Sequence, residues 1–165
     1  MQTASRTEPF ARSPKNSSGL TLIELLVTFT IVVLLAAISI NVYANALEKS
    51  KVTRAIVEIR GIEKAIADHQ VNHELPDSLD DIGWGQHLDP WGSPYRFLKF
   101  KKNNNGKVIP GQARKDRFLV PLNSEYDLYS MGPDGDSKGP LAAKASRDDI
   151  LRANDGAFIG LASDF

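Results

Sequence analysis

The chain has 165 residues, and its 20 basic side chains balance 20 acidic ones, so no net charge attracts it to nucleic acid. It contains no cysteine, which excludes disulfides and Cys-based zinc or redox sites. Behind a polar start and an apolar segment, about 120 residues remain, enough for one small domain. A domain this small without disulfides needs another source of stability, and a bound metal ion is one option.

The first 40 residues change abruptly in composition. Residues 1–19 are polar, with three basic residues against one acidic residue, and their prolines and serines predict no packed structure. Residues 20–40 carry one charge, Glu24, and no glycine or proline. A helix of about 21 residues rises about 31 Å, close to the thickness of a bilayer core. The basic start predicts that residues 1–19 face the cytoplasm and that the C-terminal domain lies outside.

Three interpretations of this apolar segment compete. A secretory signal peptide would be cut after it at a small-residue site, for example near Ala37 or Ala46, but the segment is long for that role. Its helical pattern also continues beyond those sites. A plain membrane anchor leaves Glu24 unexplained, because a carboxylate inside an apolar span is costly and usually has a partner.

The third interpretation rests on a motif. Residues 18–27, SGLTLIELLV, resemble the class III signal of type IV pilins and pseudopilins. The resemblance implies that a prepilin peptidase cuts behind Gly19 and that the new N-terminal residue, Leu20, is N-methylated. It also implies that Glu24 neutralises the terminal ammonium of a neighbouring subunit, which would convert two buried charges into one pair. Many family members have a proline where this chain has Asn41, so the resemblance does not extend to a kink there.

The helical pattern continues from residue 42 to residue 69. Apolar residues recur at three- or four-residue spacing, which predicts one helix face packed on a sheet. Proline at position 76 predicts that the helix ends near residues 69–73. The sequence therefore predicts one helix of about 50 residues with an apolar first half and an amphipathic second half. The stripe consists of Ile56, Ile59, Ile62, Ile66 and His69.

Short elements are predicted after this helix. Asp77 or Ser78 is a candidate N-cap of a short helix, and residues 89–95, DPWGSPY, predict a rigid turn with its aromatic rings packed inward. Residues 103–106, NNNG, predict a hairpin turn. The helix-first order predicts an α+β fold in which the long N-terminal helix packs on a small antiparallel β-sheet. Strands are predicted at residues 95–100, 108–109, 117–122 and 126–131.

The region from residue 126 to residue 149, YDLYSMGPDGDSKGPLAAKASRDD, is rich in oxygen-bearing side chains separated by glycines. Calcium takes about six to eight oxygen ligands, several of them backbone carbonyls, and glycines permit the tight turns of such a cage. A solvated acidic loop is the alternative interpretation of the same residues. The composition alone leaves both interpretations open.

Together with the 89–95 turn, this region resembles the head of the major pseudopilin of type II secretion systems. In that family the C-terminal loop binds calcium. The resemblance implies a calcium ion held by the Leu128 carbonyl and by the side chains of Ser130, Asp134, Asp148 and Asp149.

Signals for catalysis or nucleic-acid binding are weak. His69 and His73 have the spacing of helical zinc ligands, but Gln70 stands where a catalytic HExxH motif has glutamate. The sequence has no GxSxG, P-loop or GxGxxG motif. Residues 99–102 place lysines beside a phenylalanine, a pattern that a hairpin tip also has. We therefore expect neither an enzyme nor a nucleic-acid partner.

These observations predict three parts: a cleaved leader at residues 1–19, a transmembrane and polymerisation helix at 20–43, and a periplasmic head at 44–165. The expected function is a structural subunit of a type II secretion pseudopilus in the inner membrane. The expected partners are prepilin peptidase, copies of the chain, other pseudopilins and the inner-membrane assembly platform. The alternative is a type IV pilus or competence subunit with an adhesive or binding role.

Overall fold

A computed structural model describes residues 19–106, 108–109, 111, 113–117 and 119–165. All of the expected leader except Gly19 lies outside the described residues. The chain divides between Val42 and Tyr43 into two units. The described residues contain one α-helix, one four-stranded sheet and four short 3-10 helices.

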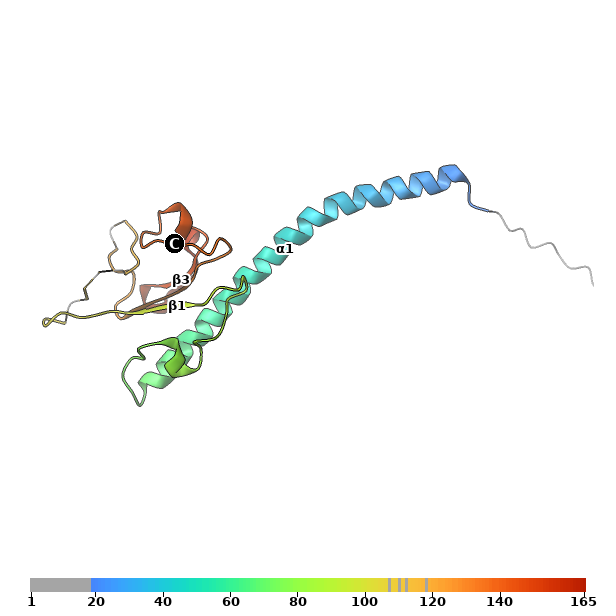
Figure 1. The fold of residues 1–165 in the computed structure, drawn as a ribbon. Coiled ribbons are helices and arrows are strands. Elements are labelled where there is room, and N and C mark those ends of the chain that lie inside the picture. The colour runs from blue at the N-terminus through green and yellow to red at the C-terminus, as the bar shows by residue number, and fades with distance from the viewer. Residues whose placement is uncertain (1–18, 107, 110, 112, 118) are drawn as a thin grey trace, which may run out of the picture. The chain divides into compact units, whose positions relative to one another are not determined.

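Helix α1 (Leu22–Gln70) confirms the prediction of one helix of about 50 residues (Figure 1). Its residues 22–42 lie in the first unit, where every side chain is exposed. Hydroxyl groups on this stretch are satisfied locally, because Thr28, Thr30 and Ser39 donate to backbone carbonyls three or four residues earlier. Helix α1 is long and apolar enough to cross a membrane by length and composition. The helix passes through Asn41 without interruption.

Residues 43–70 of α1 belong to the second unit and bury one stripe. The buried side chains are spaced by four, three and four residues, which is the pattern of a helix face turned to a core. This stripe consists of Ala55, Ile59, Ile62 and Ile66. The predicted stripe is confirmed at Ile59, Ile62 and Ile66, while Ile56 packs at the edge of the same cluster.

The sheet is antiparallel with the strand order β1-β2-β3-β4. The strands are β1 (Arg96–Lys99), β2 (Tyr126–Ser130), β3 (Ile150–Ala153) and β4 (Phe158–Leu161). The second half of α1 runs alongside these strands, as Figure 1 shows for β1 and β3. The α+β fold with a helix packed on a small antiparallel sheet is confirmed.

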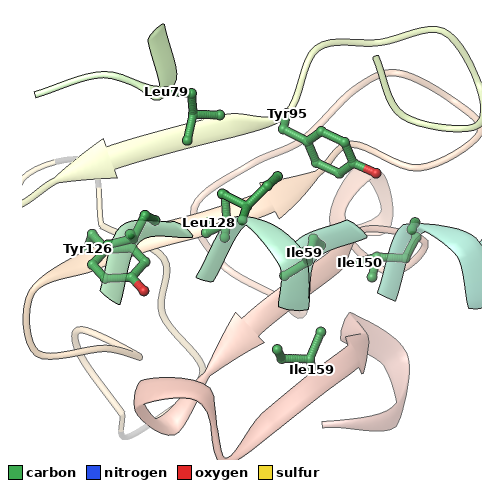
Figure 2. Packing of buried hydrophobic residues seen from close by; sticks show 10 residues of the cluster. Ile59, Leu79, Tyr95, Tyr126, Leu128, Ile150 and Ile159 are labelled. Atoms are coloured by element: carbon green, nitrogen blue, oxygen red, sulfur yellow. The ribbon is translucent and has the colours of Figure 1, made fainter. Parts of the chain in front are cut away.

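The main core lies between α1 and the sheet (Figure 2). Ile59 of α1 lies among Leu128 of β2 and Ile150 of β3, and all three side chains are almost completely buried. Burial of one such side chain contributes about 1.5–3 kcal/mol. This core holds the head together without a disulfide, and it uses the residues that alternate toward α1 along each strand.

The opposite face of the sheet is also covered. A second cluster joins Leu151 and Ala153 of β3 to Leu122, Leu141 and Ala162, which lie outside the sheet. All four residues of β3 are therefore buried. The segment of residues 131–149 between β2 and β3, called the C-terminal loop below, packs on this outer face through Leu141, so part of its order comes from apolar contact with the sheet.

Two predicted strands are wrong. Val108 makes one isolated bridge to Lys102, and the exposed Ile109 offers no core contact that would extend the pairing. The described residues of 117–122 form no strand, because Asp116 and Leu119 exchange backbone hydrogen bonds across a tight turn. Strands β3 and β4, in contrast, lie beyond residue 149, where the sequence analysis predicted no strand.

The other predicted strands, the helix cap and the hairpin turn are confirmed. The strands expected at 95–100 and 126–131 are β1 and β2. Ser78 caps the short helix Leu79–Ile82 by accepting from the Asp80 amide, and Asp81 completes a capping box. The hairpin turn is confirmed by the hydrogen bond from the Gly106 amide to the Asn103 carbonyl, 2.9 Å long.

Candidate functional site

The first site lies at the N-terminus of α1 and is a reciprocal cap around Glu24. The Thr21 amide and hydroxyl donate to Glu24 Oε2 over 2.9 and 2.8 Å, and the Glu24 amide donates to the Thr21 hydroxyl over 3.3 Å. This T-x-x-E arrangement is a capping box, in which two otherwise unpaired amides are satisfied. A carboxylate also interacts favourably with the positive end of the helix dipole. Within one chain, Glu24 therefore has a partner, which the sequence prediction did not include.

Gly19 and Leu20 precede this cap and are both exposed. A Cβ atom built on Gly19 would contact nothing within 4 Å. The peptide bond between the two residues is therefore not covered by other described residues of the chain. Cleavage at this bond, and the later methylation of Leu20, stay predictions.

The second site is the 89–95 turn, which is fastened to α1. The Asp89 carboxylate accepts from the Trp91 and Ser93 amides over 3.0 and 2.9 Å and thereby closes the turn. The Trp91 indole donates to Glu48 over 3.0 Å, and the Tyr95 hydroxyl donates to Glu58 over 2.5 Å.

Burial raises the pKa of the Tyr95 hydroxyl, and its bond to the Glu58 carboxylate raises this pKa further. Tyr95 therefore stays a proton donor well above neutral pH.

The third site is the expected calcium loop, and it contains two separate groups of contacts. In the first group, the Ser130 hydroxyl donates to Asp89 over 2.5 Å and accepts from the Gly132 amide over 3.1 Å. Gly132 has a φ of 66°, and a Cβ atom there would lie 2.3 Å from the Asp148 carbonyl oxygen. The backbone at position 132 can therefore approach Asp148 this closely only if the residue is glycine. Ser130 joins the loop to the 89–95 turn.

The second group surrounds Asp149, whose side chain is completely buried. Arg114 forms a short salt bridge with its Oδ2 atom, and the Ser137 hydroxyl donates to the same oxygen over 2.7 Å. Burial raises the pKa of the Asp149 carboxyl to about 6, while Arg114 opposes this shift. At neutral pH the pair is therefore ionic.

Comparisons with known proteins agree with these features. Residues 14–40 match the family described as the prokaryotic N-terminal methylation motif. A type IV major pilin protein of Neisseria gonorrhoeae is 34% identical over 142 residues, which cover 84% of this chain and 85% of that protein. The chain belongs to the type IV pilin-like family.

Two further relatives of this pilin-like chain have names that refer to two different assemblies, a type II secretion system and fimbriae. The type II secretion system core protein G of Pseudomonas aeruginosa is 26% identical over 76% of the chain and 89% of that protein. A fimbrial protein of Neisseria meningitidis is 27% identical over 83% of the chain and 79% of that protein. No solved structure gives a significant match. These names describe subunits of pili or of a secretion system, and none of them describes an enzyme.

The expected calcium ligands of the pilin-like head do not form one cage. Asp134 and Asp148 are neighbours, since the Asp134 amide lies 3.4 Å from Asp148 Oδ2. Ser130 is bonded to Asp89, and Asp149 is bonded to Arg114. Among the described residues, no group of three or more histidine, cysteine, aspartate or glutamate side chains is arranged to hold a metal ion.

Leu128, whose backbone carbonyl is the fifth expected ligand, lies in β2 opposite Phe97. Calcium needs about six to eight oxygens from carboxylates, carbonyls and water. The side chains of Ser130, Asp134, Asp148 and Asp149 in this arrangement do not surround a common point and do not fit a calcium ion. Calcium binding by the chain stays a prediction.

The sequence prediction missed two residues of the pilin-like head. Asp89 was predicted only as part of a turn, and Arg114 received no role, while Asp127 was counted among the oxygen-bearing side chains of residues 126–149. Asp127 is buried and accepts from the Arg114 amide over 2.6 Å and from the Asn123 side chain over 2.9 Å. The only local signal was an Asx-type residue opening the 89–95 turn. Nothing near Arg114 in the sequence points to a partner 35 residues away.

His69, His73 and Lys99, which belong to the weak zinc-like and nucleic-acid-like patterns, contact neighbouring residues of the chain. One ring nitrogen of His69 lies 3.1 Å from the Glu74 carbonyl oxygen, and His73 packs beside its ring. The Lys99 ammonium donates to the Leu75 carbonyl and to Asp77, each over 2.7 Å. These contacts hold the loop that follows α1.

Proposed function

We propose that this pilin-like chain is a structural subunit of a type II secretion pseudopilus. A prepilin peptidase cuts between Gly19 and Leu20, and the apolar part of α1 then holds the subunit in the inner membrane with its head in the periplasm. Copies of the subunit, together with other pseudopilins, polymerise on an inner-membrane assembly platform. Growth of the filament drives protein export.

The assembly step is supported by the position of Glu24. It is the only charged residue in the apolar stretch of residues 20–40, and the capping box with Thr21 satisfies it in the single chain. Cleavage behind Gly19 would create an ammonium group at Leu20, directly before the cap. When helices pack together, that ammonium of one subunit can pair with Glu24 of the next, so neither charge is buried alone.

The observation that carries the secretion role is the 89–95 turn, whose sequence resembles the major pseudopilin of type II secretion. In this head several hydrogen bonds hold the turn in place. Asp89 closes it, and Glu48 and Glu58 of α1 accept hydrogen bonds from Trp91 and Tyr95. Ser130 links the same turn to β2. A turn held at both ends presents a constant surface, as a repeating filament subunit requires.

A second candidate is a type IV pilus subunit with an adhesive or binding role. It is favoured by the 34% identity to a Neisseria gonorrhoeae pilin over 142 residues. The same N-terminal processing and the same Glu24 pairing would serve either filament. The two candidates differ in what the cell loses when the subunit is missing.

A gene deletion in the native bacterium separates the two candidates. The secretion role predicts that exported proteins accumulate in the periplasm, while surface pili and pilus-dependent adhesion or DNA uptake stay normal. Complementation with the wild-type chain should restore export, and complementation with Glu24→Ala should not. Normal export with loss of surface pili would replace the first candidate by the second.

A further inference from the structure

A buried arginine, Arg114, contacts Ser137 and Asp149 at the two ends of the C-terminal part of the loop, and Asp149 is one of the five residues for which the family resemblance implied calcium. Arg114 is 3% exposed and Asp149 is 0% exposed, and their side chains form a salt bridge. We propose that the Arg114 guanidinium is the built-in cation that closes this loop on the sheet, so that folding of this head needs no calcium.

The guanidinium makes several contacts in a fixed geometry. One of its terminal nitrogens, Nη2, pairs with Asp149, and the other, Nη1, donates to the Ser137 hydroxyl over 2.7 Å. Ser137 in turn donates to Asp149, so the three side chains close a ring. The central carbon of the guanidinium lies 4.2 Å from the centre of the Tyr129 ring, within the range of a cation–π contact. Arginine suits this site because its planar fork can satisfy two acceptors and stack on a ring at the same time.

The backbone around Arg114 is also fixed to the sheet and to the loop. The Arg114 amide donates to the buried Asp127 carboxylate over 2.6 Å, and its carbonyl accepts from the Leu122 amide over 3.1 Å. The next residue, Lys115, exchanges backbone hydrogen bonds with Gly139 and Leu141, each 3.0 Å long. Arg114 and Lys115 therefore join Asp127 of β2 to Gly139 and Leu141 of the loop. The side chain of Arg114 adds a third contact, to Asp149 at the end of the loop.

The charges explain why a second cation is unnecessary. A completely buried carboxylate such as Asp149 is strongly destabilising without a partner, and Arg114 provides that partner from within the chain. A calcium ion at the same carboxylate would lie beside the fixed positive charge of the guanidinium, which never deprotonates in proteins. Arg114 and Ser137 occupy Asp149 Oδ2, while Asp149 Oδ1 has no hydrogen-bond partner among the described residues. A calcium ion at Oδ1 would share one carboxylate with the fixed positive charge of Arg114, and the repulsion between the two cations disfavours calcium at Asp149.

The first experiment measures thermal unfolding of the full chain in detergent micelles by the fluorescence of Trp84 and Trp91, which both pack against the main core. The unfolding midpoint should be the same with millimolar calcium chloride, with magnesium chloride and with chelator. A midpoint that rises with calcium and saturates, while magnesium has no effect, would overturn the proposal. This result does not depend on which filament the subunit forms.

The second experiment tests Arg114 itself. Arg114→Gln should lower the unfolding midpoint by several degrees, whereas the neighbouring Lys115→Gln removes the same charge from an exposed side chain and should leave it almost unchanged. Combining Arg114→Gln with Asp149→Asn should lower the midpoint by clearly less than the sum of the two single effects, because each change removes the same salt bridge. Equal effects of Arg114→Gln and Lys115→Gln, or fully additive effects in the double variant, would contradict the role of Arg114.

If Arg114→Gln does not fold, two milder variants carry the same test. Arg114→Lys keeps the charge but loses the fork, and Ser137→Ala removes one member of the ring. Both should lower the midpoint by less than the loss of the arginine and should remain insensitive to calcium. A calcium-dependent midpoint in the folded Ser137→Ala variant would show that the loop takes calcium with Arg114 present, and this would also overturn the proposal.

Discussion

Residues 22–42 and residues 43–70 belong to the same helix, but their side chains have opposite surroundings. In the first part every side chain is exposed, including large apolar ones such as Leu34 and Ile38. In the second part a stripe from Ala55 to Ile66 is completely buried against the sheet. The same helix therefore contains a segment whose side chains are exposed in the described part of the chain and a segment that packs on a core.

This difference indicates where the chain depends on other molecules. Apolar side chains that the chain itself leaves uncovered need lipid or neighbouring subunits around them. The head of residues 43–165 contains its own core, a buried ion pair between Arg114 and Asp149 and a partly buried one between Arg152 and Glu63. Changes in residues 19–42 should therefore affect processing and assembly, and changes in the head should affect stability.

The largest expected effect is on processing. Gly19→Val should block cleavage completely, because a bulky side chain would stand directly before the scissile bond, whereas Gly19→Ala should be cut slowly or normally. Mass spectrometry of the membrane-bound chain measures the outcome: the Val variant should keep residues 1–19, and the wild type should begin at Leu20. A wild-type chain that begins beyond Ala37 would contradict the prepilin interpretation.

The next effect is on assembly. Glu24→Ala should insert into the membrane and keep the unfolding midpoint of the head, but it should form no filaments when overproduced, because the ammonium of the neighbouring subunit loses its partner. Electron microscopy of sheared filaments measures this. Asp68→Ala removes an exposed acid from the second part of α1 and should leave filaments intact. Normal filaments from Glu24→Ala would remove the assembly role of this carboxylate.

The contrast between the two parts also explains what the sequence could predict. Both parts of α1 are visible locally, as an apolar run and as a three- and four-residue spacing, so the helix was predicted to its last turn. The capping residue Ser78 and the turn at residues 103–106 likewise depend on neighbouring residues only. Glu24 was identified in the same way, because its motif is contiguous and includes the start of the apolar run.

Strands β3 and β4 could not be predicted because their signal is not local. Each has four residues, and β3 is buried on both faces, so the usual alternation of apolar and polar residues is absent. Its Arg152 looks like a surface residue, yet it pairs with Glu63 of α1, 89 residues earlier, over 2.7 Å. The partner of Arg114 was hidden for the same reason: a buried salt bridge joins residues that only the folded chain brings together.

A moderate effect on the free energy of unfolding is expected when a core side chain of α1 is shortened. The same change in the first part of the helix should have no such effect. Ile62→Ala removes a completely buried side chain and should lower the free energy of unfolding by about 2–5 kcal/mol. Ile38→Ala makes the identical change at a side chain that is 60% exposed, and it should leave the stability of the head unchanged. Thermal unfolding followed by tryptophan fluorescence compares them. Equal losses in both variants would mean that the two parts do not divide assembly from stability.

The smallest effect is expected at the fastened turn. Tyr95→Phe keeps the ring in the core but removes the hydroxyl that donates to Glu58, and it should lower the free energy of unfolding by about 1 kcal/mol. Tyr43→Phe removes a hydroxyl from an exposed ring in the same unit and should have no measurable effect. Chemical denaturation at neutral pH measures both variants. A loss in Tyr95→Phe no larger than in Tyr43→Phe would mean that the bond to Glu58 does not stabilise the turn.

The same variant should change how stability depends on pH. Burial raises the pKa of Tyr95, and it raises the pKa of Tyr126 to about 12. Below about pH 10 both tyrosines are protonated in the folded and in the unfolded chain, so their contribution is fully present. As the pH rises beyond this value, the unfolded chain releases protons that the folded chain retains, and stability falls. Tyr95→Phe should therefore lose stability less steeply than the wild type between pH 10 and pH 12, because the proton that Tyr95 retains in the folded chain is absent from the variant. Parallel pH curves for the two proteins would show that Tyr95 does not hold its proton in the folded head.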